Sequence, residues 1–160
     1  MKTNQWSFID KSQWPQRGEW DKEPDKVQWI DEATNLDCLI HRGTSDALCG
    51  YVGLPPGHPF HGKDYNDVKR TDGSYLNVHG GLTFASPCSE KVRADGGGIC
   101  HIPAPGRPAN VWWLGFDCAH CDDKTPAYES TILNGTYRTL DYVKSEVVQL
   151  AAQLVWEIVK

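Results

Sequence analysis

Residues 111–123 read Val-Trp-Trp-Leu-Gly-Phe-Asp-Cys-Ala-His-Cys-Asp-Asp, an apolar run that ends in carboxylates, thiols and an imidazole. The run from Val111 to Phe116 carries no charge and is rich in aromatic residues, which is typical of a strand covered on both faces. Beyond it the backbone must leave the sheet, so the polar side chains can converge on a ligand. Such clusters are common at metal and catalytic sites. This stretch therefore predicts a strand that carries a functional site at its carboxyl end.

The length and composition of the chain favour one domain. It has 160 residues, of which 39% are hydrophobic, enough to bury one sizeable core across residues 1–160. The net charge is −5 with both signs interspersed, which argues against a nucleic-acid partner, since such proteins carry a basic patch. No window approaches the roughly 18 apolar residues of a membrane span, and the N-terminus lacks the apolar core of a signal peptide. We therefore expect a cytoplasmic protein without a membrane partner.

The six cysteines are expected to be thiols, because disulfides are rare in a reducing cytoplasm. Cys38 and Cys49 flank a predicted hairpin turn at residues 42–46. A turn centred between two residues would place both thiols on one sheet face, as small buried core residues.

Most of the remaining pattern is that of an antiparallel sheet. Residues 1–24 form an irregular lead segment whose tryptophans, Trp6, Trp14 and Trp20, are expected to dock onto the domain. Three short runs rich in β-branched and aromatic residues then predict an antiparallel meander. They are Val27–Asp31, Cys38–His41 and Leu48–Val52.

Residues 76–84 alternate between apolar and polar side chains and predict a further strand. The alternation places His79 on the face opposite the apolar one, with Gly81 leaving space beside the imidazole. If this strand neighbours the 111–116 strand, His79 and Asp117 share a depression floored by Gly115. Residues 91–94 and 99–102 predict one more hairpin around a run of three glycines.

The C-terminus predicts a long amphipathic helix over residues 137–160, capped by Thr139 or Asp141. One apolar stripe suits packing on the sheet and consists of Leu140, Val143, Val147, Leu150, Leu154 and Ile158. A second stripe widens it and leaves a homodimer open as an alternative to core packing: Val148, Ala152, Val155, Trp156 and Val159. The predicted fold class is α+β, a mainly antiparallel sheet with one long C-terminal helix packed on it.

A shaped loop with three prolines and two glycines covers residues 54–65. Because Pro fixes the backbone and Gly permits tight turns, polar groups there are held on a stiff support. The loop predicts either a functional surface that includes His58, His61, Lys63 and Tyr65, or a solvated connector.

Several of these motifs occur together in a family that the chain resembles. They are Gly57-His-Pro59 with Gly62-Lys-Asp-Tyr65, Val78-His-Gly-Gly-Leu-Thr-Phe84, Cys100-His-Ile-Pro103, and Trp112-Trp-Leu-Gly-Phe-Asp-Cys-Ala-His120. Together they resemble a family of small uncharacterised proteins encoded by phages and bacterial genomes. The resemblance runs from Glu23 to Asp123 and implies no named activity. It singles out His58, Lys63, Tyr65, His79, Thr83, Asp117 and His120, whereas Cys121 lies outside the motif.

Three kinds of site fit the residues of the cluster. A structural zinc would use Cys118 and Cys121 with Cys88, Cys100 or His101, since thiolates at this spacing suit tetrahedral zinc. A catalytic divalent metal, such as zinc, would use His79, Asp117 and His120, with Asp122 or Asp123 as a further ligand or base. A metal-free site would have Asp117 orienting His120 or His79 for acid–base catalysis.

The sequence thus leads to two hypotheses of function. The first is a small hydrolase, with or without a metal, that acts on a phosphorylated or nucleotide-like substrate. Its catalytic residues are His79, Asp117 and His120, and its substrate contacts are His58, Lys63, Tyr65 and Thr83. The second is a phage-encoded binding or inhibitor protein directed at a host protein, in which the tryptophans and the proline-rich loop make the contacts and the His/Asp/Cys cluster is structural.

Overall fold

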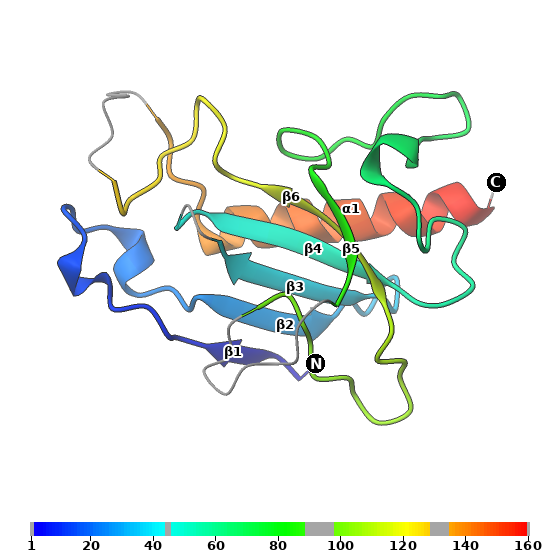
Figure 1. Ribbon diagram of the computed structural model, residues 1–160, viewed down its shortest axis with the longest axis horizontal. Coiled ribbons are helices and arrows are strands. Elements are labelled where there is room, and N and C mark those ends of the chain that lie inside the picture. Colours follow the sequence, from blue (N-terminus) through cyan, green and yellow to red (C-terminus); the bar gives the residue numbers. More distant parts are fainter. Residues whose placement is uncertain (1, 44–45, 89–97, 129–134, 160) are drawn as a thin grey trace.

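The computed structural model describes residues 2–43, 46–88, 98–128 and 135–159, with side chains through residue 155. In this part of the chain the strands form one six-stranded sheet in the order β1-β2-β3-β4-β6-β5, and every neighbouring pair is antiparallel. A long C-terminal helix, α1 (Leu140–Val159), covers one face of the sheet (Figure 1). The predicted α+β class is confirmed. The strands are β1 (Asn4–Trp6), β2 (Lys26–Ile30), β3 (Asp37–Arg42), β4 (Leu48–Leu54), β5 (Phe84–Pro87) and β6 (Trp112–Asp117).

The meander predicted from residue 27 onward is confirmed as β2, β3 and β4. Asn35 makes the first turn possible because it adopts a left-handed backbone, with φ of 58°, which Asn tolerates better than most residues. The strand beginning at residue 111 is β6, which lies between β4 and β5. It is buried on both faces, as its uninterrupted apolar sequence predicts.

The two faces of the sheet carry separate apolar clusters. On the helix side, Ile40, Val52 and Leu114 pack with Val143 and Val147 of α1. On the other side, Leu39, Cys49, Tyr51, Val111 and Trp113 form a smaller cluster. Gly50 allows the helix to come close, because a Cβ there would overlap the side chains of Val147 and Phe116.

The predicted placement of Cys38 and Cys49 on one face is wrong. Cys38 pairs with Val52 and Cys49 with His41, so even-numbered residues of β3 lie opposite even-numbered residues of β4, and odd-numbered residues opposite odd-numbered ones. The two thiols therefore point to opposite faces and belong to different clusters. Both are free and buried, as expected. The error came from the turn, whose register is centred on a residue and not between two residues.

Helix α1 begins three residues later than predicted, and Thr139 caps it. The Thr139 hydroxyl accepts the Tyr142 N–H at 3.2 Å, and Glu23 accepts the Leu140 N–H at 3.0 Å. In the first stripe Val143, Val147, Leu150 and Leu154 are buried. In the second stripe Val148 and Ala152 are exposed, whereas Val155 packs on the core.

The lead segment is less irregular than predicted, because it contributes the edge strand β1 and two short 3-10 turns, Lys11–Gln13 and Glu19–Asp21. Its aromatic residues do dock onto the rest of the protein. Trp20 is 5% exposed and meets the Tyr137 ring edge-on, and the Arg42 guanidinium lies over Trp14.

The predicted strand over residues 76–84 is wrong for most of its length. The chain turns at residues 78–81, where the Gly81 N–H donates to the Val78 carbonyl, and a strand begins only at Phe84. Gly80 and Gly81 have φ of 67° and 81°, so the glycine pair makes a turn that overrides the alternating pattern. The predicted hairpin fails at residues 99–102, which form no strand, and its other half lies outside the described residues.

The cysteines also depart from the expectation of six thiols. Cys88 and Cys100 form a disulfide, which removes both from the structural zinc site considered above. Cys121 is exposed and Cys118 is buried. Burial, ahead of the charge of Asp123, raises the pKa of the Cys118 thiol and disfavours the thiolate that zinc needs. Within the described residues, no helix combines the length and apolar character required to cross a bilayer.

Candidate functional site

Three segments meet at the carboxyl end of β6 and bring two histidines and two carboxylates together. His79 comes from the 78–81 turn, and Asp117, His120 and Asp123 come from the end of β6 and the loop after it. This loop is held at its start, where the Cys118 N–H donates to Leu48 in β4. It then turns back, with the Asp123 N–H donating to the His120 carbonyl. The first turns of α1 close the site from the other side.

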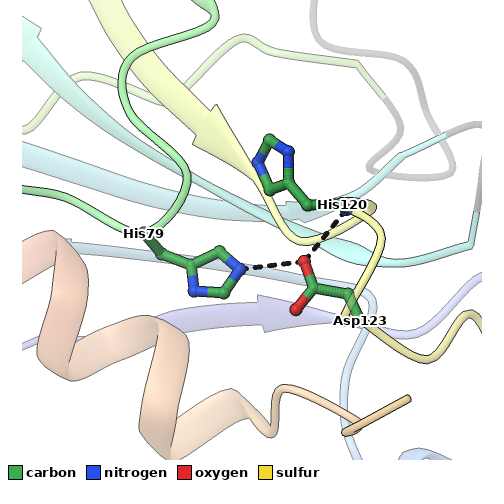
Figure 2. A group of neighbouring side chains, drawn as sticks. All are labelled: His79, His120 and Asp123. Atoms are coloured by element: carbon green, nitrogen blue, oxygen red, sulfur yellow. Dashed lines mark hydrogen bonds and ion pairs between the residues drawn. The ribbon is translucent and has the colours of Figure 1, made fainter. Parts of the chain in front are cut away.

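Asp123 is the centre of the cluster, and its side chain is only 1% exposed. Its Oδ2 accepts from His79 Nε2 at 2.8 Å and from the His120 backbone N–H at 3.0 Å (Figure 2). Its Oδ1 accepts from Arg138 Nε at 2.8 Å. Burial opposes ionisation of this carboxyl, but the bonds from Arg138, His79 and His120 outweigh it and lower its pKa. Asp123 is therefore a carboxylate.

His79 has a partner on each ring nitrogen. Nε2 faces Asp123, and Nδ1 lies 2.8 Å from the Tyr142 hydroxyl. Because the Asp123 carboxylate can only accept, the neutral ring carries its hydrogen on Nε2, and Nδ1 accepts from Tyr142. The His79 N–H donates to Glu146 at 2.9 Å. Burial and then the charge of Glu146 raise the pKa of Tyr142, so its phenol keeps the proton that this bond needs.

The His120 ring is less constrained than that of His79. Its Nε2 is buried without a hydrogen-bond partner among the residues that the structure describes, and it lies 3.6 Å from Asp117 Oδ1, too far for a hydrogen bond. The ring centroids of His79 and His120 are 5.6 Å apart. Gly80 lets the ring approach, because a Cβ at residue 80 would overlap it. A buried nitrogen without a partner is costly, so a ligand that bonded to this nitrogen would remove that cost.

Asp117 lies at the edge of the cluster, with its side chain 34% exposed. It accepts from the Thr83 hydroxyl at 2.9 Å and from the Ala119 N–H at 3.0 Å. The pairing of Phe84 with Gly115 brings Thr83 to this position. The predicted depression floored by Gly115 is wrong, because the Tyr51 ring fills the space above Gly115.

The structure brings together three sequence-predicted site residues, His79, Asp117 and His120, and adds Thr83 through its bond to Asp117. The residues of the proline-rich loop have other neighbours. His58 Nδ1 accepts from Phe60, and the Lys63 carbonyl accepts from the Trp112 indole. Tyr65 instead lines a cavity with Gly81 and Leu82, which lie just after His79 in the chain.

His79, His120 and Asp123 form a group that could hold a metal ion. Ligand atoms of His79, His120 and Asp123 all lie within 4.8 Å of one another. An ion bound to His79 Nε2 and Asp123 Oδ2 would take the place of the hydrogen between them. The His79 Nδ1–H would then donate to Tyr142, as metal-binding histidines usually donate to an outer partner. Arg138 would orient the carboxylate from its other oxygen.

The sequence alone did not predict the central position of Asp123, which entered only as an additional ligand. Its spacing of three residues after His120 is the signal available, because it allows one tight turn to present both groups. Tyr142, Glu146 and Arg138 were missed because nothing local marks a helix start as one wall of a site.

Comparisons with protein-family models, with curated proteins and with solved structures found no match. The geometry of the cluster therefore supplies the functional argument.

Proposed function

We propose that the protein is a metal-dependent hydrolase of phosphorylated small molecules, with His79, His120 and Asp123 as the metal ligands. The observation that carries the proposal is the unpaired His120 Nε2 within a group of three ligand-bearing residues. Two imidazoles and one carboxylate leave coordination positions for water and substrate. Zinc is the metal that this donor set suits in hydrolases.

The chemistry requires few further groups. A bound divalent ion would supply hydroxide near neutral pH and positive charge for a phosphoryl oxygen. In the hydrolysis the water oxygen bonds to phosphorus, the bond to the leaving oxygen breaks, and the proton of the water ends on the leaving group. Asp117 is the exposed carboxylate beside His120 and is suited to carry that proton.

A structural role for the cluster is the competing function class, and one observation favours it. Both Asp123 oxygens are already bonded, and these bonds tie the β6 loop to the 78–81 turn and to Arg138. In that case the protein would be a binding or inhibitor protein that acts through its surface. The His120 ring distinguishes the two classes, because its buried Nε2 has no hydrogen-bond partner among the described residues, whereas a structural role would need one.

The test compares His120→Gln with His61→Gln. His61 is a matched control, since its ring binds the Asn110 carbonyl outside the cluster. We expect His120→Gln to keep its melting temperature and to lose metal affinity and phosphoesterase turnover by at least about 10–100-fold, the range found when even outer partners of metal ligands are removed. Metal content after mild purification and hydrolysis of p-nitrophenyl phosphate are the measurements.

Unchanged metal content and turnover in His120→Gln would contradict the proposal and would favour a structural role for the cluster. Finding iron in place of zinc would instead point to oxygen chemistry, because two histidines and one carboxylate also form the ligand set of iron oxygenases. Asp117→Asn tests the role of Asp117 as a base. We expect this variant to keep its metal and to lose turnover. If it keeps both metal and turnover, Asp117 takes no part in the reaction.

A further inference from the structure

We propose that the cavity lined by Tyr65, Asn66, Tyr75, Leu76, Gly81 and Leu82 binds the base of a nucleotide and presents its phosphate to the His/Asp cluster. This inference deepens the proposed function and rests on it for the reaction, though not for the binding. The cavity has a volume of about 350 Å³. That is near the lower end for ligand sites, which run from about 300 to 1,000 Å³, and it suits one ring system better than an extended molecule.

The cavity and the cluster share one short segment of chain. His79 lies at the start of the segment, Gly81 and Leu82 line the cavity, and Thr83 donates to Asp117 at its end. The lining residues Gly81 and Leu82 therefore lie between His79, which binds Asp123, and Thr83, which binds Asp117. Gly81 adds to the space, because the direction of its absent Cβ is open.

The lining indicates a planar, partly polar ring. Two tyrosines provide aromatic faces, Leu76 and Leu82 provide apolar walls, and Asn66 provides an amide. Stacking on an aromatic side chain tolerates any base, since every base has a π-face. The Asn66 amide donates one hydrogen to Asp64 Oδ1 at 3.0 Å, which fixes its orientation. An amide that is held in place can form hydrogen bonds with the edge of a base.

A cation beside the cavity favours a phosphorylated ligand over a neutral one. Lys69 Nζ lies 5.0 Å from the centre of the Tyr75 ring. Tyr75 is 61% exposed, so its ring is accessible to a ligand. An anionic ligand that stacked on Tyr75 would cover this ring and gain an attraction to Lys69.

The experiment is a calorimetric titration of the full-length protein with adenosine and uridine monophosphates, with the two nucleosides, and with inorganic phosphate. We expect the monophosphates to bind and the nucleosides to bind more weakly, with phosphate weakest. Tyr75→Leu should weaken nucleosides and monophosphates about 10-fold, because stacking on one aromatic is worth about 1–3 kcal/mol per base.

Tyr128→Leu is the matched control, since Tyr128 is 58% exposed and does not line the cavity. It should bind as the wild type does. Tyr65→Leu provides a second variant of the cavity, so that a folding defect in one tyrosine variant does not decide the result. Equal affinity of the wild type and both cavity variants would overturn the inference, as would the absence of nucleotide binding at millimolar concentration.

The two proposals fail separately in this design. Nucleotide binding in the cavity supports the cavity inference even if the hydrolase proposal fails. The hydrolase proposal fails if His120→Gln retains full turnover, or if the wild type shows no turnover. If p-nitrophenyl phosphate hydrolysis depends on His120 while nucleotides do not bind, the hydrolase stands and the nucleobase inference is overturned.

Discussion

Gly80 permits a close contact in the cluster, between the 78–81 turn and the His120 ring. Its left-handed backbone, with φ of 67°, and the absence of a Cβ are both required. We expect Gly80→Ala to displace the ring and to reduce metal affinity and turnover by at least about 10-fold, as disturbance of metal-site geometry generally does. It should also cost about 1–2 kcal/mol because alanine disfavours this backbone.

Gly73→Ala separates these two effects. Gly73 has φ of 83° and open space where a Cβ would lie, so the variant carries the backbone cost without the overlap. Urea unfolding and metal titration of both variants are the measurements. Equal metal affinity in Gly80→Ala and Gly73→Ala would show that the position of His120 does not matter.

His41 makes stability depend on pH, independently of the candidate site. Burial, followed by the charge of Lys26, lowers its pKa to about 4, and its Nε2 accepts from the Gly98 N–H. An unfolded histidine titrates near 6.5, so from about pH 6.5 down to 4 the unfolded chain binds a proton that the folded chain does not. Stability therefore falls as the pH falls through this range.

Replacement by Gln should reduce this slope, because it removes the titrating group. His58 and His101 also have lowered pKa values as a result of burial, so the slope should decrease only in part. Urea unfolding of wild type and His41→Gln at half-unit steps measures it. Identical slopes in both proteins would contradict the assignment to His41.

At the scale of elements, sequence patterns predicted those strands and that helix whose formation depends on nearby residues. The meander followed from short runs of β-branched and aromatic residues separated by turns, and α1 followed from apolar steps of three and four residues, which bury one side of a helix. The strand predicted at residues 76–84 failed because alternation was counted across two consecutive glycines, which support a turn more readily than a strand. The pairing of His79 with Asp123 could not be predicted, because it depends on how a turn and a loop 44 residues apart are packed.

The start of α1 gives the prediction at this scale. Thr139 accepts the Tyr142 N–H, and Tyr142 in turn binds His79. Thr139→Ala should cost about 0.5–2 kcal/mol, the usual effect of losing a capping side chain. Thr139→Ser is the control, since serine caps equally well and should restore most of the stability. Chemical denaturation measures both, and equal losses in the two variants would exclude a capping role.

For the whole molecule, one buried ionic network joins the lead segment to the sheet and to the start of α1. Asp25 Oδ2 accepts from the Phe8 and Ile9 N–H groups, and Oδ1 lies 2.8 Å from Lys11 Nζ and 3.0 Å from Arg42 Nε. Arg42 continues to Tyr137, whose hydroxyl donates to Glu23, the residue that accepts the Leu140 N–H. Sequence separations of up to 117 residues explain why no local pattern reveals it.

We expect Asp25→Asn to destabilise the protein by about 3–5 kcal/mol, the usual cost of removing one member of a buried ion pair. The side chains of Asp25 and Arg42 are fully buried, so solvent cannot replace the lost carboxylate. This loss is a large part of the about 5–15 kcal/mol that holds a typical domain folded. Asp21→Asn is the control, because Asp21 pairs with Arg17, whose side chain is 56% exposed, and should cost less than about 1 kcal/mol.

The decrease in the free energy of unfolding at acidic pH tests the same network. Burial opposes ionisation of Asp25, but the bonds from Lys11, Ile9 and Phe8 outweigh it and lower its pKa. Its contribution is therefore complete above about pH 3.9, the value for an unfolded Asp, and is lost as the pH falls through the folded pKa. Asp25→Asn should lose less stability than the wild type on acidification, and limited proteolysis should cleave the variant first within residues 1–24. If acidification lowered the stability of both proteins equally, or if the protease cleaved the variant first outside residues 1–24, Asp25 would not secure the lead segment.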